Sequence, residues 1–99
     1  LNTTHGQPAS GIEVTLHLLD SQQALATGIT DTDGRVRFDT ELTLAETYTL
    51  NFATKDYCQN AFSAVFFPKV DVHFYVDDQR HYHIPLLLSP YSYSTYRGS

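Results

Sequence analysis

Apolar and polar residues alternate strictly along Ile12-Glu13-Val14-Thr15-Leu16-His17-Leu18. The same period of two recurs at residues 47–52 and 70–76. Successive side chains of a β-strand point to opposite faces of a sheet, so each stretch is typical of a strand that buries one face. Together these stretches predict a β-sheet with an apolar inner face and a polar outer face.

Turn-forming residues separate the alternating stretches. Asp31-Thr32-Asp33-Gly34 is typical of a hairpin turn and predicts a short strand after it, at residues 35–38. Residues 55–64 lack alternation and predict a short helix with Thr54 as its N-cap. Further strands are predicted at residues 24–30, 81–88 and 91–96. Seven or eight short strands and one helix predict a mainly β protein, a β-sandwich, with residues 1–99 forming a single domain.

Charge is sparse and mostly negative in this chain of 99 residues. Six basic residues stand against 11 acidic residues, which gives a formal net charge of −5. Nucleic acids and anionic membranes attract clustered lysine and arginine, so we predict neither as a partner. No apolar run approaches the ~20 residues that cross a bilayer as a helix. The 41% of hydrophobic residues predicts a globular domain rather than a disordered chain.

Cys58 is the single cysteine, which excludes an internal disulfide and a multi-cysteine metal site. Its neighbours Tyr57 and Gln59 supply neither a cation nor a second thiol. We therefore expect a buried, unreactive thiol rather than a nucleophile. The expected location is the cytoplasm, or the periplasm or peroxisome if an N-terminal leader has been removed.

Five histidines are the candidates for chemistry. His5 lies in a turn, and His17 and His73 occupy the outward phase of predicted strands, so we expect all three on solvated surfaces. His81 and His83 lie two residues apart on one predicted strand, which places both rings on one face, about 7 Å apart. This spacing is compatible with a metal-binding pair, a polar sheet face or a catalytic base. A zinc site would need two further ligands, and no nearby cysteine or carboxylate is placed to supply them, so we predict no metal and no other cofactor.

The C-terminal segment Tyr91-Ser92-Tyr93-Ser94-Thr95-Tyr96-Arg97-Gly98-Ser99 is rich in hydroxyl groups and carries one cation. On a strand, Tyr96 is in phase with Ser94 and Ser92. If this strand pairs with the strand of His83, an imidazole, a phenol, a guanidinium and a hydroxyl converge. Such a set suits a planar, polar heterocycle. A frayed chain end is the alternative interpretation.

Two C-terminal motifs, His81-Tyr82-His83-Ile84-Pro85-Leu86-Leu87-Leu88-Ser89-Pro90 and Tyr93-Ser94-Thr95-Tyr96-Arg97-Gly98-Ser99, resemble the signature of the 5-hydroxyisourate hydrolases, the transthyretin-related protein family. Residues 1–11 resemble the first motif of that family, and Thr32-Asp33-Gly34-Arg35 resembles its second. The resemblance implies a transthyretin-like β-sandwich and a homotetramer of two dimers with active sites at the dimer–dimer interface. It also implies a hydrolase that opens the ring of 5-hydroxyisourate, its small-molecule substrate, in urate degradation.

The resemblance also implies which residues form the site. The catalytic residues of the family fall on His83, Arg35 and Ser99, and its substrate-binding residues fall on Arg35, His83 and Tyr96. Without the resemblance, Arg35 would be interpreted as an exposed turn residue. The first motif of the family begins with a second catalytic histidine, two residues ahead of the position of Leu1, so we expect the sequence to be incomplete at this end.

Chemistry assigns roles to these groups. Imidazole titrates near neutral pH, so His83 is the candidate general base for an attacking water. Arg35 is the candidate cation for the oxygen that gains negative charge, and Tyr96 and Ser99 would orient the substrate or the water. A transthyretin-like small-molecule carrier without catalysis is the alternative function, and a non-catalytic sandwich module is a third.

Overall fold

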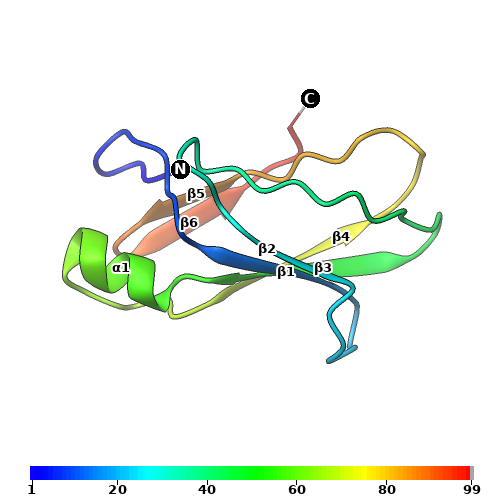
Figure 1. The fold of residues 1–99 in the computed structure, drawn as a ribbon, viewed down its shortest axis with the longest axis horizontal. Helices are drawn as coiled ribbons and strands as arrows, with labels where there is room; N and C mark the ends of the chain where they lie inside the picture. Colours follow the sequence, from blue (N-terminus) through cyan, green and yellow to red (C-terminus); the bar gives the residue numbers. More distant parts are fainter. Residues whose placement is uncertain (99) are drawn as a thin grey trace.

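The alternating stretches form one antiparallel sheet in the computed structural model, which describes residues 1–98. Its strands are β1 (Glu13–Leu18), β2 (Ala26–Ile29), β3 (Thr47–Ala53) and β4 (Val70–Tyr75), in the order β2-β1-β3-β4. A second sheet pairs β5 (Leu86–Ser89) with β6 (Ser92–Thr95). The two sheets form separate layers, and the single helix lies at one end (Figure 1).

Strand register places the apolar side chains of the first sheet on one face. Val14 pairs with Phe52 and Leu16 pairs with Leu50, so the apolar phases of β1 and β3 coincide. Their inner face packs against Leu86 and Leu88 of β5, and Leu88 is 1% exposed. The core therefore lies between the two sheets, and the predicted mainly β sandwich with one short helix is confirmed.

Helix α1 (Lys55–Phe62) forms within the predicted range and ends two residues earlier than predicted. Thr54 occupies the N-cap position, but its hydroxyl donates to the carbonyl oxygen of Phe67 at 2.6 Å and caps no helical N–H. Thr54 is fully buried, so this hydrogen bond joins the helix start to the loop before β4. Within residues 1–98, α1 is too short to cross a membrane, and there is no longer helix.

Cys58 lies on the inner side of α1 and is buried in the core, as predicted for an unreactive thiol. Burial raises the pKa of the Cys58 thiol because it penalises the thiolate. The thiol is therefore a weak nucleophile at neutral pH.

The predicted strand at residues 35–38 does not form. The turn before it is present: the N–H of Gly34 donates to the carbonyl oxygen of Asp31 at 2.9 Å, and Gly34 has φ +73°, which favours glycine. Val36 and Phe38 pack inward while Arg35 and Arg37 are exposed, so the alternation persists without strand pairing. The alternation of apolar and polar residues therefore indicates which side chains are buried, but it does not show that a neighbouring strand is available for backbone hydrogen bonds.

The predicted strand at residues 81–88 is shorter than expected, because β5 begins only at Leu86. Pro85 has no N–H to donate, which interrupts the ladder immediately before β5. Ahead of that interruption His83 forms a single isolated bridge with Gly98, whose N–H donates to the carbonyl oxygen of His83 at 2.7 Å.

The other three histidines lie away from the core. His73 is exposed, and its Nδ1 lies 2.8 Å from the hydroxyl of Thr49 on the neighbouring strand. His17 is half-buried; its Nε2 lies 2.9 Å from the Thr15 hydroxyl, and its buried Nδ1 has no partner within residues 1–98. His5 is exposed in a turn. The predicted surface positions are thus confirmed for His5 and His73, whereas His17 is more covered than expected.

Asn2 joins the first turn to both the second sheet and the helix. It is 1% exposed, and its side-chain Nδ2 donates to the hydroxyl of Tyr57 on α1 at 3.0 Å. Its neighbour Thr3 donates its N–H to the carbonyl oxygen of Leu88 at 3.0 Å. Each polar atom buried here therefore has a partner, as burial of an amide requires.

Candidate active site

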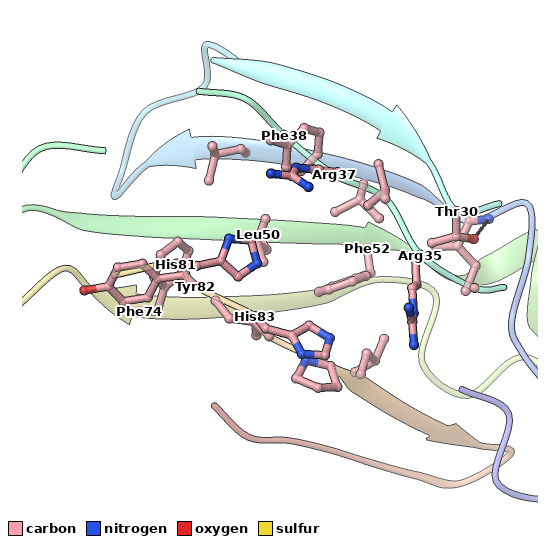
Figure 2. Close-up of a pocket in the computed structure, with 18 of the residues that line it drawn as sticks. Thr30, Arg35, Arg37, Phe38, Leu50, Phe52, Phe74, His81, Tyr82 and His83 are labelled. Atoms are coloured by element: carbon pink, nitrogen blue, oxygen red, sulfur yellow. Dashed lines mark hydrogen bonds between the residues drawn. The ribbon is translucent and has the colours of Figure 1, made fainter. Parts of the chain in front are cut away.

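A pocket of about 1000 Å³ opens beside the second sheet. One wall is the extended segment after the Asp31 turn, and the other is the segment that leads into β5. Apolar side chains of β1 and β3, including Val14 and Phe52, line its inner end. The polar groups that line it include Arg35 and His83 (Figure 2), together with Tyr96.

Arg35 is positioned by the turn that precedes it. Its backbone N–H donates to Oδ1 of Asp31 at 3.1 Å, and the same oxygen accepts the N–H of Asp33 at 2.8 Å. The guanidinium of Arg35 forms no salt bridge within residues 1–98, whereas that of Arg37 lies 3.7 Å from Asp39. The positive charge of Arg35 is therefore not neutralised by a neighbouring carboxylate, and its side chain extends into the pocket (Figure 2).

His83 and His81 both line the pocket, as predicted from their spacing. The two histidines nevertheless have different surroundings. His83 is joined to the C-terminal segment by the bridge to Gly98, and its imidazole lies directly against Gly98. No comparable backbone bridge holds His81 within the described part of the chain. Residues 1–98 contain no group of three or more His, Cys, Asp or Glu side chains arranged to hold a metal ion.

Tyr96 and Arg97 lie on opposite faces of the C-terminal segment. Directly opposed residues of an antiparallel pair share a face, so Gly98 shares the face of His83, and Thr95 shares the face of the buried Leu86. By alternation, Tyr96 joins His83, whereas Arg97 points the other way. Tyr96 is 55% exposed and lines the pocket.

The expected convergence of four groups is therefore wrong for the Arg97 guanidinium. It stacks on the ring of Tyr82, with its central carbon 4.3 Å from the ring centroid. The fourth group, the hydroxyl of Ser99, lies outside the described residues. Arg35, which belongs to a distant part of the sequence, lines the pocket together with two further arginines, Arg37 and Arg80.

A polar cluster that the sequence analysis missed surrounds Arg97. The hydroxyl of Tyr82 accepts the backbone N–H groups of Asp77 and Asp78 at 3.0 and 3.2 Å. A hydrogen bond from Arg80, 2.8 Å from Nε to Oδ2, is the main reason that the pKa of Asp78 is lowered to about 2. The adjacent aspartates Asp77 and Asp78 were the sequence signal for this cluster. Their shared partner Arg97 lies 20 and 19 residues away from them in the sequence, so the pairing could not be predicted.

Comparisons with known proteins agree with this architecture. Residues 1–98 match the HIUase/Transthyretin family. The chain is 42% identical over 107 residues to the probable 5-hydroxyisourate hydrolase of Schizosaccharomyces pombe, covering 100% of this chain and 86% of that protein. It is 39% identical over 104 residues to the 5-hydroxyisourate hydrolase of Salmonella dublin, covering 100% of this chain and 76% of that protein.

Solved structures with the same fold include an enzyme and a carrier. The 5-hydroxyisourate hydrolase of Klebsiella pneumoniae superposes with a TM-score of 0.86 at 32% identity, covering 100% of this chain and 93% of that one. Sea bream transthyretin in complex with thyroxine superposes with a TM-score of 0.86 at 30% identity, covering 99% of this chain and 89% of that one. The fold alone does not separate the two, and the family that residues 1–98 match is described by both names. This chain belongs to the HIUase/Transthyretin family.

Proposed function

We propose that this chain is a 5-hydroxyisourate hydrolase, which opens the ring of 5-hydroxyisourate in urate degradation. The observation that carries the proposal is the pocket in which Arg35, His83 and Tyr96 come together from two distant parts of the sequence. A chain similar over its full length to proteins named 5-hydroxyisourate hydrolase would need such polar groups at one site.

The reaction requires water to add to a ring carbonyl, after which the C–N bond breaks and the released nitrogen takes a proton. His83 accepts the proton of the attacking water through an imidazole nitrogen, since histidine is the side chain most often used as a general base. Arg35 stabilises the negative charge that develops on the carbonyl oxygen, and within residues 1–98 its guanidinium has no competing carboxylate. Tyr96 orients the substrate by hydrogen bonding, and Ser99, outside the described residues, is assigned the same task.

The proposal is tested by following the ultraviolet absorbance of freshly generated 5-hydroxyisourate with and without the protein. Faster decay in the presence of protein is expected, and Arg35→Gln should reduce kcat/KM about 10²-fold, since it removes the charge that faces the developing oxyanion. The matched control is Arg37→Gln. It removes the same charge from an arginine two residues further along the chain, whose guanidinium lies 3.7 Å from Asp39. Decay at the spontaneous rate would contradict the hydrolase function.

A small-molecule carrier is the second candidate, favoured by the similarity to sea bream transthyretin in complex with thyroxine. The pocket rim argues against it, because Arg35, His83 and Tyr96 are polar groups where an apolar ligand would need apolar contacts. Calorimetric binding of thyroxine together with absent hydrolysis would support the carrier instead.

We further propose a homotetramer of two dimers with active sites between the dimers. Support comes from an aromatic patch, formed by Phe66, Phe67, Tyr91 and Tyr93, in which Phe66 is 62% and Tyr91 69% exposed. In addition, β4 and β6 are edge strands whose outer backbone groups are unpaired within the described chain. Burial of the patch and the edges against another copy would satisfy both features.

The location that we propose is the cytoplasm. The single cysteine is buried and unpaired, which fits a reducing compartment. Fractionation of cells that express the full coding sequence tests this proposal, and recovery from the periplasm or from peroxisomes would contradict it.

A further inference from the structure

The segment that carries His83 has little regular backbone support. The ladder of the second sheet ends at the pair Leu86 and Thr95, and Pro85 offers no N–H to continue it. Beyond that gap, one backbone hydrogen bond joins His83 to Gly98. The position of the imidazole therefore depends on whatever holds residues 96–98 beside it.

Arg97 supplies that support from the opposite face. Its guanidinium lies over the ring of Tyr82, the residue immediately before His83, at 4.3 Å from the ring centroid. It also lies 3.5 Å from Oδ1 of Asp77 and 3.4 Å from Oδ1 of Asp78. These two ion pairs are long and partly exposed, so they contribute little by themselves, and the stacking contact carries more of the interaction.

Tyr82 is itself fixed to the turn that precedes it. Its hydroxyl accepts the N–H groups of Asp77 and Asp78, and it also lies 3.1 Å from Oδ1 of Asp77, to which it can donate. Arg97 therefore stacks on an immobilised ring rather than on a free surface tyrosine. The contact joins the C-terminal segment to the turn at Asp77 and, through Tyr82, to His83.

Gly98 provides the space that the imidazole occupies. A Cβ at this position would lie 2.9 Å from Cγ of His83 and closer still to Nδ1. Gly98 does not have a positive φ, so alanine would meet no backbone strain there. The ring of His83 is consequently the group with which a larger residue would collide.

We propose that Arg97 and Gly98 are positioning residues for His83: Arg97 holds the C-terminal segment against the His83 segment, and Gly98 lets the imidazole lie flat on that segment. This rests on the proposed function only in making His83 the group whose position matters for catalysis. Neither Arg97 nor Gly98 is among the residues that line the pocket, so neither needs to touch the substrate.

Four single variants test the proposal in the full chain: Arg97→Gln, Arg97→Lys, Gly98→Ala and the control Arg80→Gln. Arg80 also pairs with Asp78, at 2.7 Å, and lines the pocket, but within residues 1–98 it neither stacks on Tyr82 nor takes part in the bridge to the C-terminal segment. We expect kcat to fall roughly tenfold in R97Q and about 10²-fold in G98A with KM little changed, because small displacements of a catalytic group are costly. R97K should lie between R97Q and wild type, and R80Q should match wild type.

Two readouts do not depend on activity. In NMR spectra, an Overhauser contact between the His83 ring and the Gly98 α-protons should be present in wild type and R80Q and weakened in R97Q. In thermal unfolding, G98A should lower Tm by clearly less in a His83→Ala background than in the wild-type background, because the ring is gone and only Cβ of residue 83, 3.2 Å away, remains.

The outcomes separate this proposal from the function. Wild-type kcat and an unchanged Overhauser contact in R97Q would overturn the role of Arg97. An equal loss of Tm from G98A in both backgrounds would overturn the role of Gly98. If the wild-type chain fails to hydrolyse 5-hydroxyisourate, the function is wrong, and the NMR and double-variant results still decide the positioning.

Discussion

His81 and His83 differ by what lies beneath each ring rather than by residue type. Both line the pocket, but the His83 imidazole rests on Gly98 and is held by a backbone bridge. A general base must be held within hydrogen-bond reach of its proton, so the better-supported histidine is the better candidate.

His83→Asn should keep the fold and lower kcat/KM by about 10²-fold or more, since asparagine cannot accept a proton at neutral pH. The side chain is exposed, so little core packing is lost. His81→Asn is the matched control and should cost far less. Steady-state kinetics with circular dichroism of both variants is the measurement, and equal losses would show that the two histidines act together.

Asp78 predicts an acid-dependent loss of stability. Its pKa falls from 3.8 to about 2 on folding, chiefly through the hydrogen bond from Arg80. A carboxyl with a lowered folded-state pKa stabilises the fold above its unfolded value and loses that contribution as the pH falls toward the folded value. The Tm difference between wild type and Asp78→Asn should therefore shrink between pH ~4 and pH ~2.

The contribution is small because the carboxylate is near the surface. Asp39→Asn provides the control. It removes a carboxylate that is almost fully exposed and whose ion pair with Arg37 is long, at 3.7 Å. A Tm difference for D78N that stays constant from neutral pH to pH ~2 would contradict the assignment.

At the scale of single residues, motifs predicted residues that line one pocket, their roles stay predictions, and orientations set by distant contacts were not predictable. His83, Arg35 and Tyr96 were predicted and line one pocket. The direction of Arg97 was not predicted, because it depends on Tyr82, 15 positions earlier in the numbering, and on the register of two short segments. Ser99 stays a prediction.

At the scale of elements, periodicity located the sheets and overestimated two strands. Residues 35–38 and 81–85 alternate correctly but lack ladders, the first because it packs over β2 rather than beside it, and the second because of Pro85. Side-chain alternation is set by burial, whereas a strand also requires a neighbouring backbone with free donors and acceptors.

Gly28 shows how the extended segment is accommodated. Gly28 pairs with Val14 on β1, and a Cβ there would overlap Cγ2 of Val36 and lie 3.3 Å from Cε1 of Phe38. Because valine is stiff at χ1, Gly28→Ala should force the segment that carries Arg35 away from the sheet, at a cost of roughly 1–3 kcal/mol.

Denaturant unfolding of G28A, Val36→Ala and the double variant measures this coupling. Val36→Ala removes the atom that would collide, so the double variant should be more stable than the sum of the two single effects predicts. Strict additivity would show that the two residues do not meet.

At the scale of the whole molecule, the aromatic patch and the edge strands β4 and β6 are features that a single copy leaves uncovered. Phe66 contacts Phe67 and Tyr91 edge to face, so its exposed ring is held in one place rather than free in solution. Ordered aromatic groups of this kind are enriched at protein interfaces.

Phe66→Asp should dissociate the tetramer, because a carboxylate cannot be buried there without a partner. Leu25→Asp is the control, since Leu25 is a similarly exposed apolar residue outside the patch. Sedimentation velocity at micromolar concentration gives the oligomeric state. A monomeric wild type, or a tetrameric F66D variant, would contradict the proposed assembly through this patch.

Family and fold were accessible from the sequence at this scale, because the motifs span the chain and the alternation is regular. The tetrameric assembly, which the resemblance implies, stays a prediction. The aromatic rings that form the patch come from two loops and one strand, and their proximity follows from the packing of the two sheets rather than from any local pattern.

The buried amide of Asn2 has a consequence for how quickly the native state can be reached. It sits where residues at the start of the chain meet Leu88 and the helix, so its hydrogen bond to Tyr57 joins positions 55 apart, and those of Thr3 join positions 85 apart. Such contacts form only after most of the chain has collapsed, and their loop-closure entropy is offset only then. Refolding is consequently expected on a timescale of about milliseconds to seconds, typical of sandwich topologies, with attachment of the first turn among the last events.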